Sequence, residues 1–162
     1  MSSRDMVRRA REQVGTGTRP GKRPSMALAV VTCMDTRLDP LQFFQSRPGD
    51  IHAIENAGGL VTDDVIRSLL ISQRHFGTRR VAVVMHTDCG LLGVDNQAEA
   101  STILDETGIE IPFMLGGFTD IRERLAESVL TVRATPLLPH RDDVRGYVYD
   151  VDTLRLTEVT IG

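Results

Sequence analysis

The sequence has no tryptophan, only two tyrosines and five phenylalanines, and no long run of apolar residues. So few aromatic side chains argue against a surface that stacks the bases of single-stranded nucleic acid. A formal net charge of −3 gives no general basic footprint either. A membrane-spanning helix needs about 20 consecutive apolar residues, which the sequence does not contain. We therefore expect neither nucleic acid nor a membrane as a partner.

The chain has only two cysteines, Cys33 and Cys89, which are too few for a disulfide scaffold and too far apart for a CxxC redox motif. Its 162 residues fit a single domain that can bury a full core without the help of disulfides. The first residues lack the apolar core of a secretory signal, so we expect a cytoplasmic, reducing setting.

The segment 1–24 differs in composition from the rest of the chain, because it contains seven basic and two acidic residues. Apolar residues at helical spacing predict a short helix over residues 3–14, and the GTGTRPGKRP stretch that follows predicts an irregular connector. This helix has little apolar surface, so we expect it to lie on its own domain or on a partner chain. We therefore divide the chain into an N-terminal arm, residues 1–24, and a main domain, residues 25–162.

Strands and helices are expected to alternate along the main domain. The early strands are wholly apolar, as is typical of strands buried on both faces of a sheet. Capping residues mark helix starts, among them Asp39 before Pro40 and Thr62 before two aspartates. The expected strands cover residues 26–32, 50–54, 81–85, 146–151 and 154–159, and the expected helices cover 39–46, 63–76, 97–106 and 119–132. The pattern predicts an α/β fold with a mainly parallel β-sheet flanked by helices.

Reactive side chains follow two of these strands. Cys33, Asp35 and Arg37 alternate after the first strand, and alternate side chains of an extended backbone share a face. His86 and Cys89 follow the third strand at a spacing that lets both reach one ion. In parallel sheets, sites form outside the carboxyl ends of strands. Imidazole and thiolates are good zinc ligands, and three protein ligands leave one tetrahedral position open for chemistry.

Taken singly, these residues have ordinary explanations, because a buried cysteine usually behaves as a small hydrophobic residue. Taken together, the C-x-D-x-R pattern that starts at Cys33 and the H-x-x-C-G pattern that starts at His86 resemble the β-class carbonic anhydrases, especially their shorter microbial members. The NAGG loop at residues 56–59 and the segment VTDDVIRSLLISQRHFGT resemble the same family, so the resemblance covers nearly the whole chain.

The resemblance implies a role for each matching residue. Cys33, His86 and Cys89 would bind zinc, one ion per chain. Asp35 and Arg37 would form the neighbouring catalytic pair, in which Arg37 keeps Asp35 ionised. Asp35 would accept a hydrogen bond from zinc-bound hydroxide, or in a closed state would become a fourth zinc ligand.

Further expectations concern the pocket and the assembly. The resemblance implies that Gly90 presents its backbone N–H to substrate and that Gly58 and Gly59 help to wall the pocket. The family is at least dimeric, with an N-terminal helix that reaches over the partner subunit, so a homodimer or a higher homo-oligomer is implied. The family often has arginine where this chain has Glu55. The absence of tryptophan excludes the tryptophan-containing bicarbonate pocket of some members.

The implied activity is the reversible hydration of carbon dioxide to bicarbonate and a proton, by attack of zinc-bound hydroxide. An enzyme of this kind is a zinc lyase, also called a carbonate dehydratase. His52, His75 and His140 are candidate proton carriers because histidine titrates near neutral pH, although each also suits a surface or packing role.

Two other functions stay open. The same zinc site could hydrolyse carbon disulfide or carbonyl sulfide, with only the access route differing. The chain could instead be a non-catalytic zinc-thiolate sensor, because thiolate ligands can be oxidised and then release metal. The pairing of Asp35 with Arg37 argues against a sensor, since a purely structural site would not need it. Nucleotide binding is set aside because the sequence has no GxGxxG or P-loop pattern.

Overall fold

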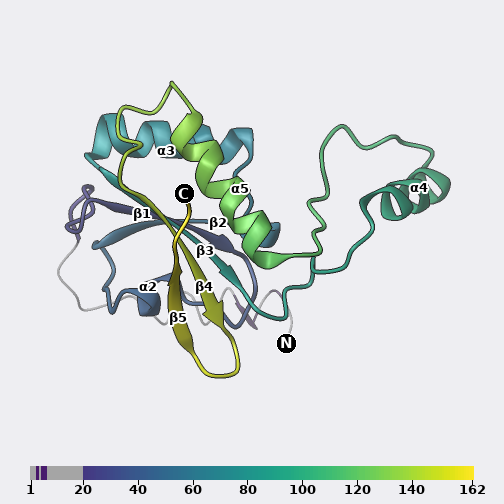
Figure 1. Ribbon diagram of the computed structural model, residues 1–162, viewed down its shortest axis with the longest axis horizontal. Helices are drawn as coiled ribbons and strands as arrows, with labels where there is room; N and C mark the ends of the chain where they lie inside the picture. The colour runs from purple at the N-terminus through teal and green to yellow at the C-terminus, as the bar shows by residue number, and fades with distance from the viewer. Residues whose placement is uncertain (1–2, 4, 7–19) are drawn as a thin grey trace.

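A five-stranded sheet forms the centre of the described part of the protein (Figure 1). Its strands are β1 (Leu28–Cys33), β2 (Ile51–Asn56), β3 (Arg80–His86), β4 (Val144–Asp150) and β5 (Arg155–Val159). They lie in the order β2-β1-β3-β4-β5. The pairings β1–β2, β1–β3 and β3–β4 are parallel, and β5 pairs antiparallel with β4. The predicted α/β fold with a mainly parallel sheet is therefore confirmed.

The computed structural model describes residues 3, 5–6 and 20–162. Apart from three isolated positions, the predicted helix over residues 3–14 lies outside the described residues. The division into an arm, residues 1–24, and a main domain, residues 25–162, therefore stays a prediction. In the part of the chain that the structure describes, no helix has the length and apolar character needed to cross a membrane.

Helices lie on both sides of the sheet. The helical elements of the described residues are α2 (Pro40–Phe43), the 3-10 turn η1 (Ala57–Gly59), α3 (Asp63–Phe76), α4 (Asn96–Thr107), which lies away from the sheet, and α5 (Ile121–Ala134). Figure 1 shows α3 and α5 along one side of the sheet and α2 on the other. The predicted caps are present, because the Asp39 side chain accepts from the N–H of Leu41 and the Thr62 side chain accepts from the N–H of Val65.

Helix α2 is shorter than the sequence suggested. The prediction extended it to Ser46, but the helix ends at Phe43 and Phe44 is its C-cap. Gln45 then adopts a left-handed backbone with φ of 49°, a conformation that interrupts the helical hydrogen-bond series. The N–H of Ser46 bonds back to the carbonyl of Leu41 at 2.8 Å and closes the turn.

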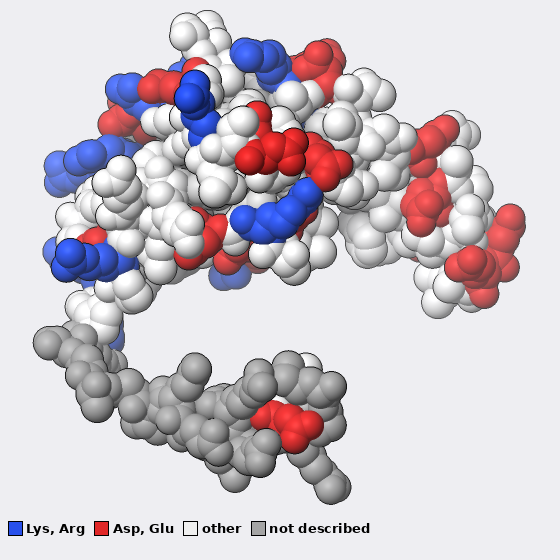
Figure 2. Space-filling model, turned by 90° about the horizontal axis from the view of Figure 1, so that it is seen from below, with Lys and Arg blue, Asp and Glu red and all other residues white. Residues whose placement is uncertain are grey.

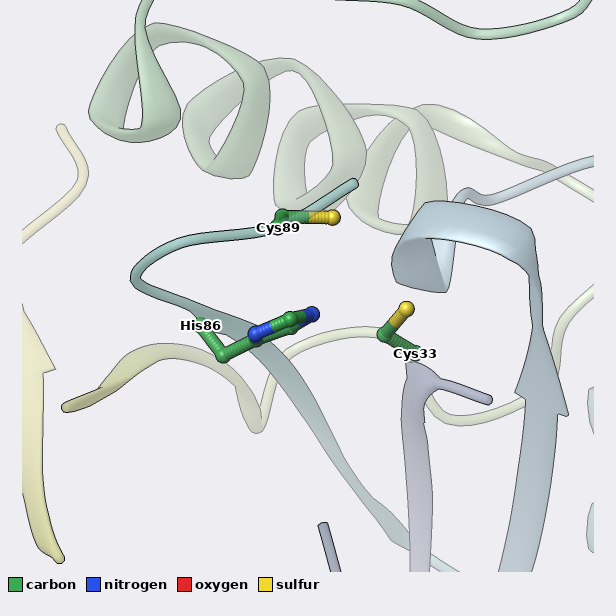
Figure 3. Close-up of side chains that lie close together, drawn as sticks. All are labelled: Cys33, His86 and Cys89. Carbon is green, nitrogen blue, oxygen red and sulfur yellow. The ribbon is translucent and has the colours of Figure 1, made fainter. Parts of the chain in front are cut away.

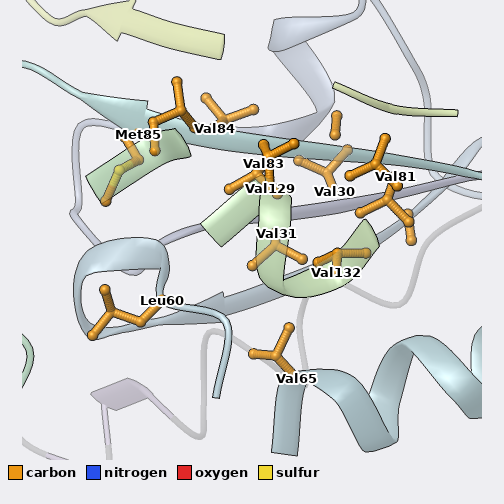
Figure 4. Packing of buried hydrophobic residues seen from close by; sticks show 14 of the residues in the cluster. Val30, Val31, Leu60, Val65, Val81, Val83, Val84, Met85, Val129 and Val132 are labelled. Atoms are coloured by element: carbon orange, nitrogen blue, oxygen red, sulfur yellow. The ribbon is translucent and has the colours of Figure 1, made fainter. Parts of the chain in front are cut away.

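The core lies between the sheet and its helices. All six residues of β1 are buried, and so is every residue of β3 after Arg80. Figure 4 shows valines of these strands packed with side chains from the helices and from the loop after β2. The labelled members of this cluster are Val30, Val31, Leu60, Val65, Val81, Val83, Val84, Met85, Val129 and Val132. Burial on both faces explains why these strands are continuous apolar runs.

Residues 91–118, called the α4 arm below, project away from the sheet (Figure 1). A bridge between Leu92 and Phe118 closes the base of this arm. None of the residues of α4 is buried, and large apolar side chains of the arm are exposed. They include Leu104, Ile109, Phe113 and Met114. The arm therefore has an apolar surface that the single chain does not cover. A short helix without packing partners is only marginally stable in water, so α4 would gain stability from a partner.

The NAGG loop packs against the carboxyl end of β1. Gly59 has a φ of +63°, and a Cβ atom there would lie 2.9 Å from the carbonyl carbon of Thr32 and 3.0 Å from the backbone N of Cys33. The amide of Asn56 closes the loop, since its Nδ2 donates to the carbonyl of Leu60 and its Oδ1 accepts from the N–H of Leu60, both at 2.8 Å. Glycine at position 59 therefore permits both the turn and the close approach to β1.

We expect Gly59→Ala to lower the free energy of unfolding by about 2–5 kcal/mol. Left-handed strain costs about 1–2 kcal/mol, and displacement of the β1 backbone adds about 1–3 kcal/mol. Gly77→Ala is the matched control, because Gly77 has a φ of +75° but open space around it. Urea unfolding of both variants measures the difference, and equal losses would contradict a role for the close approach.

Candidate metal centre

Three side chains with metal-binding atoms meet at the carboxyl ends of β1 and β3. Cys33 is the last residue of β1, His86 is the last residue of β3, and Cys89 lies in the loop that follows β3. Their ligand atoms all lie within 4.8 Å of one another. Figure 3 shows the three side chains pointing into a common space. The structure therefore brings together the three predicted metal ligands.

The register of the sheet explains why these residues meet. Thr32 is opposite Val84 in the parallel pair of β1 with β3, so Cys33 and His86 leave the sheet at the same edge. After β3, Thr87 anchors the loop, because its N–H donates to the carbonyl of Tyr149 at 2.9 Å. The side-chain oxygen of Thr87 also accepts from the N–H of Val151 at 3.1 Å.

The ring of His86 is held in one orientation and presents one nitrogen to the cysteines. Nδ1 lies 2.9 Å from the carbonyl of Thr87, so Nδ1 carries the proton and donates. The other nitrogen, Nε2, is buried without a hydrogen-bond partner. Burial lowers the pKa of His86, which favours the neutral ring that binds metal. A buried lone pair without a partner is costly, and a metal ion would satisfy it.

The two cysteines are free and buried. Burial, the largest cause, raises the pKa of the Cys89 thiol, and the neighbouring Cys33 raises it further. Two thiolates side by side are therefore unfavourable without a positive charge. A divalent cation supplies that charge and deprotonates coordinating thiols. The set of two sulfurs and one imidazole nitrogen suits zinc, whose bonds to these atoms are about 2.3 and 2.0 Å long.

Asp35 lies beside this cluster, gripped by Arg37. The guanidinium Nε donates to Oδ1 at 2.9 Å, and Nη2 donates to Oδ2 at 2.8 Å. These bonds hold the pKa of the Asp35 carboxyl far below its usual range, so the group is ionised at neutral pH. Oδ2 also lies 3.9 Å from Nε2 of His86. Asp35 is not one of the three clustered ligands, so in this arrangement its carboxylate is directed to Arg37.

The glycines expected to line the pocket lie around the same strand ends. Gly58 and Gly59 are buried in η1, and a Cβ on Gly58 would lie 2.8 Å from Cδ1 of Leu91. The NAGG loop therefore lies against the segment just after Cys89. At Gly90 a Cβ would meet no atom within 4 Å, so the chain there borders open space.

Comparison with known proteins agrees with this arrangement. A family model described as "Carbonic anhydrase" matches residues 28–112. Beta-carbonic anhydrase 1 of Mycobacterium tuberculosis is 42% identical over 137 residues, which cover 85% of this chain and 84% of that protein. The chain belongs to the β-class carbonic anhydrases. Members of this family are enzymes, and so is this chain.

Two further relatives mark the range of the family. The crystal structure of a carbonic anhydrase from Streptococcus mutans superposes with a TM-score of 0.88 at 37% identity, covering 99% of each chain. A carbon disulfide hydrolase of Acidianus sp. is 33% identical over 153 residues, which cover 80% of this chain and 75% of that protein. The same fold therefore occurs in proteins named for two different substrates.

One charged residue of this β-carbonic anhydrase was missed by the sequence reasoning. Asp88 gives Arg37 a second carboxylate, because Nη1 of Arg37 donates to its Oδ2 at 2.7 Å. The backbone carbonyl of Asp88 also accepts from Nη2 of Arg37 at 2.8 Å. The available signal was its place directly before Cys89 in the H-x-x-C-G segment.

The three histidines considered as proton carriers make contacts elsewhere in the fold. Nδ1 of His52 lies 2.7 Å from the hydroxyl oxygen of Ser72 on α3. The ring of His75 packs against Phe76 at the end of the same helix. The backbone N–H of His140 donates to the side chain of Gln73 at 2.9 Å. These contacts belong to the packing of α3, and a role in proton transfer stays a prediction.

Proposed function

We propose that this chain catalyses the reversible hydration of carbon dioxide to bicarbonate and a proton, with one zinc ion held by Cys33, His86 and Cys89. The observation that carries the proposal is the combination of two features at one sheet edge. Three buried ligand atoms converge there, and an ionised carboxylate held by Arg37 lies 3.9 Å from Nε2 of His86. Membership in the carbonic anhydrase family supports the proposed reaction.

The residues of the chain have distinct tasks in this proposal. When bound, zinc would lower the pKa of a coordinated water towards neutrality and so supply hydroxide for the reaction. Two thiolates neutralise most of the charge of the ion, so other groups must help to orient the attacking oxygen. A carboxylate oxygen has two lone pairs. Oδ2 of Asp35 uses one for Arg37, which leaves the other to accept an O–H and direct the oxygen towards carbon.

Glycines would form the substrate side of the pocket. We propose that the N–H of Gly90 donates to an oxygen of carbon dioxide or bicarbonate and that Gly58 and Gly59 wall the pocket. The open space at Gly90 supports this placement, because a side chain there would occupy the room that a small substrate needs. A Cβ atom at position 58 would lie 2.8 Å from Cδ1 of Leu91, so glycine there lets this wall lie close to the segment after Gly90.

We expect purified protein to contain one zinc ion per chain. Cys89→Ala and His86→Ala should each lose most of the metal, because each variant removes one of only three protein ligands. His52→Ala should keep it, since His52 contacts Ser72 on α3. Elemental analysis after dialysis against a weak chelator provides the measurement. Full zinc content in Cys89→Ala would contradict the assignment.

We expect the zinc-loaded protein to hydrate carbon dioxide in a stopped-flow assay, and Arg37→Lys to be slower by roughly ten- to hundred-fold. Lysine keeps the charge but lacks the planar fork that grips both oxygens of Asp35. A charge-assisted hydrogen bond is worth about 1.5–3 kcal/mol, and about 1.36 kcal/mol corresponds to ten-fold in rate.

The control for this variant is Arg67→Lys, which alters an exposed pair with Asp64 on α3 and should leave the rate unchanged. Wild-type rates in Arg37→Lys would reduce the pair with Asp35 to an ordinary surface salt bridge. A zinc-replete wild-type protein that does not hydrate carbon dioxide would refute the proposed reaction.

Hydrolysis of carbon disulfide or carbonyl sulfide is the second candidate. The observation in its favour is the similarity to carbon disulfide hydrolases, and the same assay with carbon disulfide as substrate separates the two. A zinc-thiolate sensor without turnover is less well supported, because it gives Asp35 and Arg37 no task. The free thiols of Cys33 and Cys89 suit a reducing compartment, so we also propose a cytoplasmic location.

We further propose that the enzyme is a homodimer or a higher homo-oligomer in which a second copy covers the α4 arm. The arm exposes Phe113 and Met114, and Figure 2 shows acidic side chains gathered on it. Residues 91–118 contain no lysine or arginine, whereas residues 1–24 are strongly basic. Opposite charges on the two segments would favour association between copies.

We expect the full chain to sediment as a dimer or larger species at micromolar concentration. Phe113→Asp should shift it towards monomer, because a charge would enter an apolar contact. Leu137→Asp is the matched control, since Leu137 is 62% exposed and Phe113 64%, but Leu137 lies outside the arm. Deleting residues 1–20 should also weaken the assembly. A wild-type monomer under these conditions would contradict the proposal.

A further inference from the structure

Arg37 is held between two carboxylates, those of Asp35 and Asp88, and Oδ2 of Asp35 lies 3.9 Å from Nε2 of His86. The edge formed by Nε and Nη2 grips Asp35 at 2.9 and 2.8 Å. The remaining nitrogen, Nη1, donates to Oδ2 of Asp88 at 2.7 Å. Nη2 also reaches the carbonyl of Asp88 at 2.8 Å. Four contacts therefore fix the planar group at all three of its nitrogens.

We infer that Asp88 is a positioning residue that aims the guanidinium of Arg37 at Asp35. The inference rests on the proposed carbon dioxide hydration. Arg37 itself is 42% exposed, so its long side chain has room to take other rotamers. Asp35 engages one edge of the fork, and Asp88 supplies the contact at the opposite nitrogen. With Nη1 fixed, the plane of the group stays in the orientation that serves both oxygens of Asp35.

Simple ion-pair attraction explains this contact less well than positioning does. The side chain of Asp88 is 79% exposed, and exposed pairs contribute little to stability. The contact does, however, join the loop after β1 to the loop after β3. Asp88 also directly precedes Cys89, so the same short segment would hold both the metal and the orientation of the catalytic pair.

The backbone at Asp88 determines which variants test the inference. Its φ is 53°, a conformation that glycine and asparagine adopt readily. Asp88→Gly removes the carboxylate without adding backbone strain. Asp88→Asn keeps an oxygen that can accept from Nη1 and keeps the same backbone preference. Both variants retain the backbone carbonyl of residue 88, which accepts from Nη2 of Arg37. They therefore differ only in whether a side-chain oxygen can accept from Nη1.

We expect Asp88→Gly to keep its zinc and its unfolding midpoint but to lose about five-fold in kcat/KM, the upper end for an exposed pair. Asp88→Asn should remain within about two-fold of wild type, because its amide oxygen restores the contact. When Arg37→Lys is also present, the variants with Asp88→Gly and with Asp88→Asn should have equal kcat/KM, because lysine has no planar fork for residue 88 to orient.

A readout independent of turnover is the NMR signal of the Arg37 Nε–H. This signal should be sharp in the wild type and in Asp88→Asn, and should weaken by exchange in Asp88→Gly. A wild-type kcat/KM together with a wild-type Nε–H signal in Asp88→Gly would overturn the inference. A five-fold loss that persists in the Arg37→Lys background would also overturn it, because Asp88 would then act without Arg37.

Failure of the proposed function is distinguishable from failure of this inference. A zinc-loaded wild-type protein that does not hydrate carbon dioxide refutes the reaction. The Nε–H comparison then still decides whether Asp88 orients Arg37.

Discussion

The parallel pairing of β1 with β3 is the contact on which the site depends. The hydroxyl of Thr32 donates to the carbonyl of Val84 at 3.0 Å in a fully buried position, which ties the two strands together just before they end. Because parallel strands finish at the same edge of a sheet, Cys33 and His86 become neighbours there. A shift of one residue in this pairing would turn one of them to the opposite face, and the three ligands would no longer meet.

The same edge holds a buried nitrogen without a hydrogen-bond partner and a thiol with a raised pKa. Nε2 of His86 is buried without a partner, and burial keeps the Cys89 thiol protonated by raising its pKa. Neither feature stabilises a hydrophobic core, but both fit a site that binds a cation. The outer side of the site is built differently, because Asp35, Arg37 and Asp88 satisfy one another through hydrogen bonds. The cluster of Cys33, His86 and Cys89 could hold a metal ion, whereas the charged residues beside it already pair with one another.

The sequence predicted β1 and β3 well because each is largely an apolar run of strand length, and it predicted the starts of α2 and α3 because Asp39 and Thr62 are capping residues. It also predicted that Cys33, His86 and Cys89 would come together, since parallel strands end at one edge of a sheet and these residues lie at the ends of β1 and β3 or just beyond. The end of α2 could not be predicted, because it depends on the backbone of Gln45. The contact of Arg37 with Asp88 could not be predicted either. The sequence alone does not show that the loop facing Arg37 follows β3 rather than β2.

In the proposed enzyme, selection between carbon dioxide and carbon disulfide would come from the route to the cluster of Cys33, His86 and Cys89 rather than from these three residues. The walls proposed for the pocket are glycines, which leave room but offer no side chains to distinguish carbon dioxide from carbon disulfide. Related carbon disulfide hydrolases match more than three quarters of this chain, and one of them shares its fold with a TM-score of 0.72. The fold alone therefore does not separate proteins named for the two substrates. Residues 91–95, which connect Gly90 to α4, are exposed or half-buried in the single chain. If a second copy covers them, association would shape the entrance, and the oligomer would determine which substrate reaches the common chemistry of β1 and β3.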